Sequence, residues 1–231
     1  DFSAEMERTL QVLDCAVLVI SAADGVQGHT ETLWKLLKRY EIPVFIFVNK
    51  MDQDGTDKKA VLGELRERFG EGCIDFTRIL PEAEASPEEL ENLAVCEEGM
   101  MEEYLETGSI RIDTLRKAAA ERKIFPCWFG SALRAEGIEA LLDGIVQLAP
   151  EIHYPEEFGA KVYKIARDSQ GTRLTYLKVT GGSLRVKDVL ADTGEKINQI
   201  RLYSGEKFET PQEVYAGQVC AVTGPEQTRP G

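Results

Sequence analysis

The first 150 residues alternate between short apolar runs and stretches in which apolar residues recur every three or four positions. The runs cover residues 15–20, 44–48 and 124–129, and each ends in a polar loop. Continuous apolar runs of this length are typical of strands that are buried on both faces, as in a parallel sheet. Outside these runs, apolar residues that recur every three or four positions predict helices over residues 3–13, 30–40, about 57–69 and 111–121.

Two consecutive buried strands joined by a helix form a right-handed parallel unit, so this half of the chain is predicted to be α/β. A helical insertion is expected near residues 70–122, irregular up to residue 87. Residues 82–106 contain ten Glu and no Lys or Arg. We interpret this segment as a solvated acidic helix, while an anion-repelling gate and a face for a protein partner remain alternatives.

After Pro150 the pattern changes to short strands of alternating polarity, separated by Gly-containing turns. Regularly spaced short strands indicate a small antiparallel β-barrel. The predicted domains are therefore residues 1–152, mainly α/β, and residues 153–231, all β. The expected strands cover residues 162–165, 174–179, 183–186, 196–200 and 218–222.

Charge supports that division. Residues 1–150 hold 29 acidic and 16 basic side chains, whereas residues 151–231 hold 11 of each. Because binding to phosphates needs basic patches, the acidic first part is not expected to bind nucleic acid, and no DNA partner is expected.

The sequence has no run of 18 apolar residues and does not open on a signal peptide, so no membrane contact and a cytoplasmic location are expected. Its five scattered cysteines predict reduced thiols and no metal site.

Candidate chemistry follows the run at 44–48, where the sequence is Asn49-Lys50-Met51-Asp52. Ligands of doubly wound sheets bind beyond the carboxyl ends of the strands. The Asp52 carboxylate can accept two parallel hydrogen bonds from guanine N1–H and its exocyclic amine, a donor pair that adenine lacks. The Asn49 side chain can link neighbouring loops, and the Lys50 stem can lie along a purine face.

An Asn-Lys-x-Asp tetrad after a buried strand resembles the guanine-specificity motif of P-loop GTPases. The run at 124–129 is followed by Ser131, Ala132 and Leu133, which resemble the turn that supports the base in that family. The resemblance implies that these three residues join Asn49, Lys50 and Asp52 in binding guanine, with a backbone N–H donating to O6. A polar strand-to-helix loop and an ordinary turn are the alternative interpretations.

The order of the two predicted domains resembles the first two domains of translational GTPases. Residues 1–6 are similar to the segment that follows Asp-x-Pro-Gly-His in elongation factor G and its relatives. Residues 24–27 with Thr30, and residues 49–55, are similar to the tetracycline-resistance ribosomal protection proteins. The resemblance covers nearly all of residues 1–225 and is weakest over 70–122. It implies GTP or GDP as ligand, Mg²⁺ in the intact protein, the ribosome as partner and a weak rRNA contact by the barrel.

Several family motifs are missing from this sequence. It contains no Gly-x-x-x-x-Gly-Lys-Ser/Thr loop and no Asp-x-Pro-Gly-His segment, which in the family carry the phosphates, Mg²⁺ and the attacking water. We expect these parts upstream of Asp1, and the family's later domains after residue 231. The predicted fold class is therefore a partial P-loop GTPase-type parallel sheet with flanking helices, followed by a small β-barrel. No catalytic residue is expected in this chain, and the strand at 15–20 is expected to be an open, pairing-prone edge.

Three functions remain open at this point. The parent protein is expected to be a ribosome-dependent GTPase, of the kind that releases tetracycline, or alternatively one similar to elongation factor G or a release factor. The chain by itself fits a non-catalytic guanine-binding or interaction module. An unrelated α/β protein with a chance tetrad is the third interpretation.

Overall fold

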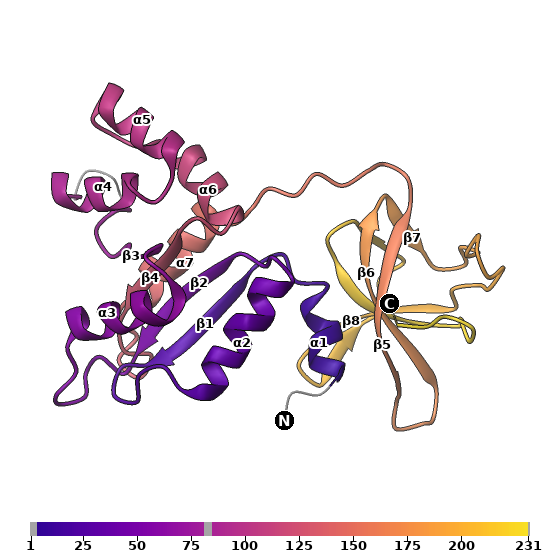
Figure 1. The fold of residues 1–231 in the computed structure, drawn as a ribbon. Helices are drawn as coiled ribbons and strands as arrows, with labels where there is room; N and C mark the ends of the chain where they lie inside the picture. Colours follow the sequence, from indigo (N-terminus) through magenta and orange to yellow (C-terminus); the bar gives the residue numbers. More distant parts are fainter. Residues whose placement is uncertain (1–3, 81–84, 231) are drawn as a thin grey trace. The chain divides into compact units, whose positions relative to one another are not determined.

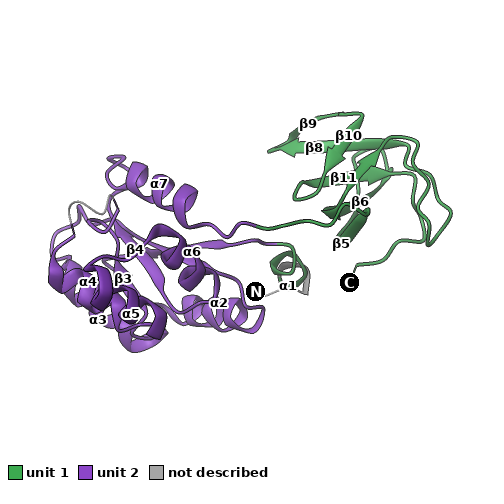
Figure 2. Ribbon diagram, turned by 90° about the horizontal axis from the view of Figure 1, so that it is seen from above, with its two compact units in different colours: residues 1–12, 152–231 green, residues 13–151 purple. Residues whose placement is uncertain are grey.

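The computed structural model describes residues 4–80 and 85–230, with side chains from residue 7 onward. Residue 3 of the first predicted helix and residues 82–84 of the acidic segment therefore lie outside the described residues. The chain divides into two compact units (Figure 2). We call Leu13–Glu151 the α/β unit, and residues 1–12 together with 152–231 the β unit.

The α/β unit contains a parallel sheet of four strands in the order β1-β2-β4-β3 (Figure 1). β2 is buried along its length because strands flank it on both edges and helices cover both faces. The predicted strands at 15–20, 44–48 and 124–129 are confirmed in place and in parallel direction, to within a residue or two. The four strands are β1 (Ala16–Ser21), β2 (Val44–Asn49), β3 (Cys73–Asp75) and β4 (Phe125–Phe129).

Helices pack on both faces of this sheet. On one face Trp34 of α2 and Phe69 of α3 stack with ring centroids 4.4 Å apart, and Trp34 meets Phe125 of β4 edge-on at 4.6 Å. On the other face Trp128 of β4 lies in a core formed with Phe45 and residues of α4 to α7. The helices of the unit are α2 (Gly28–Arg39), α3 (Lys58–Phe69), α4 (Pro87–Ala94), α5 (Glu98–Thr107), α6 (Ile112–Ala120) and α7 (Ile138–Leu148).

Local sequence signals explain several helix ends. The Asp57 side chain begins α3 by accepting hydrogen bonds from the backbone N–H groups of Lys59 and Ala60. Ser86 and Glu89 form a reciprocal capping box at the start of α4. Gly108 ends α5 in the left-handed conformation that glycine adopts without strain.

Two expectations for this unit are corrected. The strand β3 falls in a stretch expected to be irregular, because three residues are too few to show a strand pattern in the sequence. The strand β1 is not buried on both faces, since Val17 and Val19 are 41% and 59% exposed while Leu18 and Ile20 are buried. Within the described residues β1 pairs with β2 alone and forms the sheet edge, as expected from the sequence.

The β unit consists of two antiparallel sheets around one core. A five-stranded sheet has the order β5-β6-β11-β8-β9, and β7 pairs with β10. The core contains residues such as Leu177, Ile200 and Val214. The predicted fold class, a parallel α/β sheet with flanking helices followed by an antiparallel β part, is confirmed. The strands are β5 (Gly159–Arg167), β6 (Arg173–Gly181), β7 (Ser183–Arg185), β8 (Gln199–Ser204), β9 (Lys207–Glu209), β10 (Glu213–Tyr215) and β11 (Val219–Thr223).

Details of the β unit differ from the expectation. β8 begins at Gln199, although a strand was predicted over 196–200, because Lys196 forms an isolated bridge with Val189 instead. The short strands β9 and β10 were not predicted. Helix α1 (Ala4–Leu10) belongs to this unit and contacts β5. The proposed domain limits at 152/153 stay a prediction, while the compact units meet at 151/152.

Candidate guanine-binding site

The carboxyl end of β2 is tied to the loops on both sides of it. The Asn49 carbonyl accepts a hydrogen bond from the Ala22 N–H (2.8 Å), in the loop after β1. The Asn49 side-chain Oδ1 accepts from the N–H groups of Lys50 and Ala132, both at 2.8 Å. Ala132 is 83 positions further along the chain, in the loop after β4. Asn49 thus links the two loops that sequence analysis selected.

Lys50 has a backbone φ of +63°, an uncommon conformation for a non-glycine residue. The N–H of the next residue, Met51, donates to the Gly130 carbonyl at 3.0 Å. The Lys50 ammonium lies 3.9 Å from the Asp24 carboxylate, and both side chains are about half exposed or more. The sharp turn at Lys50 therefore directs the loop back toward β4 and leaves the side chain at the surface.

The Asp52 carboxylate lies in a polar environment formed by the loop after β4. A hydrogen bond from the Ser131 side chain lowers the pKa of Asp52, and partial burial opposes that effect. Ser131 is 1% exposed, so its hydroxyl is held in place by the fold. The Arg134 Nε lies 3.5 Å from Asp52 Oδ2. Asp52 is thus kept ionised and able to accept hydrogen bonds.

The loop that follows β4 is closed by its own backbone. Ser131 and Glu136 exchange backbone hydrogen bonds of 3.1 and 3.0 Å. A Cβ at Gly130 would lie 2.0 Å from the Glu136 carbonyl oxygen, so this close approach requires glycine. Within the described part of the chain, the Leu133 N–H has no hydrogen-bond acceptor, and the Leu133 side chain is 91% exposed. The turn therefore presents a free donor beside an apolar side chain.

The structure brings five of the six sequence-selected residues into one connected group: Asn49, Lys50, Asp52, Ser131 and Ala132. Leu133 follows in the same turn, and among the described residues no hydrogen bond joins it to the others. Sequence analysis missed Arg134 and Asp24, which lie against Asp52 and Lys50. Asp24 was noted only as part of the similar segment 24–27, and Arg134 is a single charged residue in a polar loop.

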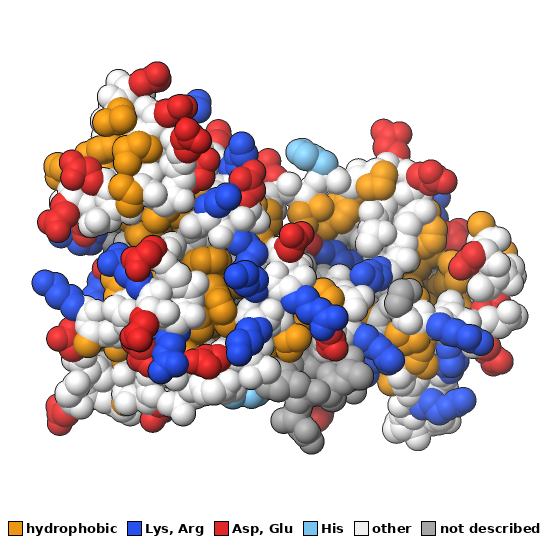
Figure 3. Space-filling model, in the orientation of Figure 1, with side chains coloured by type: hydrophobic (Ala, Val, Ile, Leu, Met, Phe, Trp, Pro, Cys, Tyr) orange, Lys and Arg blue, Asp and Glu red, His pale blue; other side chains and the backbone are white. Residues whose placement is uncertain are grey.

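A hollow with a volume of about 820 Å³ lies elsewhere in the α/β unit, between α5 and α6. Its lining holds six acidic and two basic side chains, and the acidic ones include Glu102, Glu103 and Glu106. Acidic side chains gather over α5 in the space-filling view (Figure 3). A nucleotide would be repelled there by like charge, so this hollow does not compete with the end of β2 as a nucleotide site.

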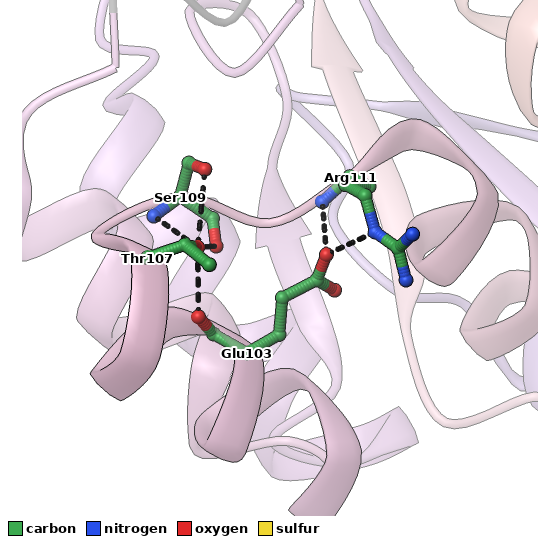
Figure 4. Close-up of polar contacts among 4 residues, drawn as sticks. All are labelled: Glu103, Thr107, Ser109 and Arg111. Atoms are coloured by element: carbon green, nitrogen blue, oxygen red, sulfur yellow. Dashed lines mark hydrogen bonds and ion pairs between the residues drawn. The ribbon is translucent and has the colours of Figure 1, made fainter.

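One side of that hollow is fixed by a local polar network (Figure 4). Glu103 pairs with the Arg111 guanidinium and accepts from the Arg111 N–H at 3.3 Å. The Thr107 hydroxyl donates to the Glu103 carbonyl at 2.8 Å and accepts from the Ser109 N–H at 3.3 Å. These contacts hold the turn between α5 and α6. The contacts of the network join residues of this turn to one another, so we interpret the network as structural.

The fold and the polar edge of its sheet are those of a GTPase-type α/β domain joined to an antiparallel β part. Residues 1–151 match the family described as the elongation factor Tu GTP binding domain. The chain belongs to this family and is of the translational GTPase class.

Two individual proteins illustrate the relationship. The oxytetracycline resistance protein of Streptomyces rimosus is 30% identical over 264 aligned positions, which cover 100% of this chain and 40% of that protein. A solved structure from Thermus thermophilus has a TM-score of 0.78 at 21% identity, and the match covers 99% of this chain and 42% of that one. The chain thus spans less than half the length of both proteins, and the second match shows the fold alone.

Among the described residues, no helix combines the length and the apolar character needed to cross a bilayer.

Proposed function

We propose that this chain provides the guanine-recognition part of a ribosome-dependent translational GTPase. The observation that carries the proposal is the link from Asn49 to the Ala132 N–H, which places the ionised Asp52 beside the turn at 131–133. In this proposal the domain limits of the sequence analysis hold, with residues 1–152 as part of the GTP-binding domain. The match to the GTP-binding family supports guanine nucleotides as the ligand.

The residues present fit guanine by their donors and acceptors. The Asp52 carboxylate accepts from N1–H and the exocyclic amine. The turn at 131–133 donates to O6 through the Leu133 N–H, while the bond from the Ala132 N–H to Asn49 fixes the position of the turn. The exposed Lys50 stem and the exposed Leu133 side chain contact the two faces of the purine.

The phosphates and Mg²⁺ are assigned to no residue of this chain. The sequence contains no Gly-x-x-x-x-Gly-Lys-Ser/Thr loop, which supplies most of the phosphate contacts in P-loop proteins. Within the described residues there is no group of three or more His, Cys, Asp or Glu that could hold a metal ion. We therefore expect weak nucleotide binding and no hydrolysis by the chain alone, as for a non-catalytic guanine-binding module.

For the whole protein we propose GTP hydrolysis coupled to release of tetracycline from the ribosome in the cytoplasm. The similarity to a protein named for oxytetracycline resistance supports this function over that of an elongation factor or release factor. A translation assay with the full-length protein separates the two. Rescue of tetracycline-inhibited ribosomes supports the first, and promotion of elongation or termination without antibiotic supports the second.

The guanine site is tested by titrating the 231-residue chain with fluorescent GDP and, separately, fluorescent ADP. We expect weak binding that is selective for guanine and is lost in Asp52→Ala. Asp54→Ala is the matched control, because Asp54 is an exposed acid of the same loop. Equal binding of the two nucleotides, or equal loss in both variants, would contradict the site. Release of phosphate from GTP above background would contradict the expected lack of hydrolysis.

A further inference from the structure

The Glu64 side chain reaches from helix α3 to the loop that follows β1. Its Oε1 atom accepts a hydrogen bond from the Val26 backbone N–H at 3.1 Å, across 38 positions of sequence, and the contact is partly buried. A hydrogen bond from a backbone N–H to a carboxylate is stronger than one between neutral groups. Residues 24–27, which we call the β1 loop, are therefore attached to a regular helix as well as to their own strand.

The Glu64 carboxylate also lies against Gly25. A Cβ at Gly25 would lie 2.6 Å from Glu64 Oε2, and the backbone φ of Gly25 is +65°. Both the close approach and the conformation favour glycine at this position. The Gly25 N–H in turn donates to the Ser21 carbonyl at the end of β1, at 2.9 Å. Glu64 thus contacts two successive residues of the β1 loop and fixes its path.

The β1 loop leads directly into α2, whose start has no cap of its own. Gln27 is the N-cap residue of α2, and its side chain makes no capping hydrogen bond. That side chain donates instead to the Asp24 carbonyl, within the loop. A carboxylate near a helix N-terminus interacts favourably with the helix dipole. Glu64 therefore supplies from α3 the negative group that the local sequence does not place at this helix end.

The loop that Glu64 contacts carries Asp24, which faces the segment proposed to bind the base. The Asp24 carboxylate lies 3.9 Å from the Lys50 ammonium, and because both side chains are about half exposed or more, this ion pair adds little to stability. Its effect is on position, since it restricts the Lys50 side chain before any ligand binds. Restricting a flexible side chain in advance lowers the entropic cost of binding.

Helix α3 is connected to the base-binding segment by a second route. The Thr56 hydroxyl, one residue before the N-cap of α3, donates to the Met51 carbonyl at 3.0 Å. Met51 lies between Lys50 and Asp52 in the sequence. The start of α3 thus contacts the segment at 49–52 directly, and Glu64, further along the same helix, contacts the β1 loop.

We propose that Glu64 is a positioning residue of the guanine site, which holds the β1 loop so that Asp24 restrains Lys50 along the purine face. Glu64 acts through the β1 loop and does not itself contact the base. The inference rests on the proposed function, because it requires Lys50 to contact guanine. It extends the site to a residue of α3, outside the loops that carry the six selected residues.

The test is titration of the 231-residue chain and its variants with fluorescent GDP. Glu64→Ala should weaken binding about three- to tenfold, because Lys50 is then ordered only when the ligand binds. Glu64→Gln keeps an acceptor oxygen for the Val26 N–H and should restore most of the affinity. Glu67→Ala is the matched control, because Glu67 is an exposed acid of the same helix, and it should bind within about twofold of the unchanged chain.

A double-mutant cycle with Asp24→Ala tests the route. If Glu64 acts through Asp24, the double variant should lose no more affinity than the more affected of the two single variants. Additive losses would overturn the proposal, and so would equal affinities of Glu64→Ala and Glu67→Ala. Failure of Glu64→Gln to recover affinity would also count against it.

A second measurement needs no ligand and keeps the two proposals apart. In amide NMR spectra, Glu64→Ala should speed hydrogen exchange at the Val26 N–H and shift the Lys50 resonance, and Glu67→Ala should do neither. Faster exchange at Val26 with an unmoved Lys50 resonance would give Glu64 a purely structural role and overturn the inference. If the unchanged chain binds no GDP, the guanine site fails, while the Lys50 resonance still decides whether Glu64 positions that side chain.

Discussion

The side-chain oxygen of Asn49 lies 2.8 Å from the backbone nitrogen of Ala132, 83 residues away, and joins the loops that follow β2 and β4. The same oxygen accepts from the Lys50 N–H.

Asn49→Ala removes the acceptor of both bonds. We expect it to lower the free energy of unfolding by about 1–2 kcal/mol and to weaken guanine binding. Urea unfolding and nucleotide titration measure the two effects. Asn49→Asp keeps an acceptor oxygen, so its unfolding free energy should change less, and a larger loss than in Asn49→Ala would contradict this account.

Asp52→Asn tests how the base is selected. An amide presents a donor where the carboxylate presents an acceptor, so it no longer matches both N–H groups of guanine. It matches xanthine, which has a carbonyl in place of the exocyclic amine. We expect selectivity to change from GDP to xanthosine diphosphate, measured by competition against a fluorescent nucleotide. Unchanged preference for GDP would show that Asp52 does not contact the base.

The pair Gly144 and Gly63 separates packing from helix propensity. A Cβ at Gly144 in α7 would lie 2.1 Å from the Trp128 ring, whereas one at Gly63 in α3 would meet no atom within 4 Å. Gly144→Ala should therefore destabilise the α/β unit by about 1–3 kcal/mol through overpacking. Gly63→Ala should stabilise it by about 0.5–1 kcal/mol, as alanine does in an open helix position. Thermal unfolding of the two variants checks this, and a shift of the same sign in both would contradict it.

The capping box of α4 predicts a pH dependence of stability. Hydrogen bonds from the Ser86 backbone N–H and then its side chain lower the pKa of Glu89 below its ordinary value of 4.5. A lowered pKa in the folded state means that ionised Glu89 stabilises the fold above about pH 4.5, and that this contribution is lost as the pH falls through the folded-state pKa. The difference in unfolding free energy between the unchanged chain and Glu89→Gln should thus shrink in acid.

The same cap can be tested at neutral pH. Ser86→Ala should lower the free energy of unfolding by about 1 kcal/mol, because the Glu89 N–H loses its acceptor. Ser86→Thr keeps a hydroxyl and should cost less. Urea unfolding of both variants gives the comparison, and equal losses would indicate that the hydroxyl does not cap the helix.

The edge strand β1 predicts self-association. Its outward side chains Val17 and Val19 are exposed, and among the described residues its second edge pairs with no strand. Val19→Lys places a charge on that edge and should reduce association at high protein concentration. Val95→Lys is the control, because Val95 is an exposed apolar residue at the end of α4. Sedimentation velocity measures both, and a concentrated unchanged chain that stays monomeric would contradict the prediction.

Sequence patterns predicted the main elements of the α/β unit because elements that are buried in the fold have an apolar composition that is visible in the sequence. The run at 44–48 is apolar at every position, which is stable in water only when strands and helices cover it. β3 was not predicted because a three-residue strand is too short to show an alternation of apolar and polar residues. β9 and β10 were not predicted for the same reason.

The six site residues were selected from the sequence because their side-chain chemistry and position after buried strands are both visible there. The sequence does not show that Asn49 accepts a hydrogen bond from the Ala132 N–H, or that Arg134 lies against Asp52. The first depends on the pairing of β2 with β4, and the second on the closed turn between Ser131 and Glu136.

The sequence by itself determined the α/β and β order of the chain and its uneven charge, because these follow from local composition and periodicity, and it supplied the residues that we propose for guanine binding. Only the tertiary structure decided which side chains meet. Four aromatic residues of the β unit show the difference: Tyr163, Tyr176, Tyr203 and Phe208 contact one another in turn, although they are spread over 46 positions of sequence. They form one surface because strand register places distant residues on the same face of a sheet.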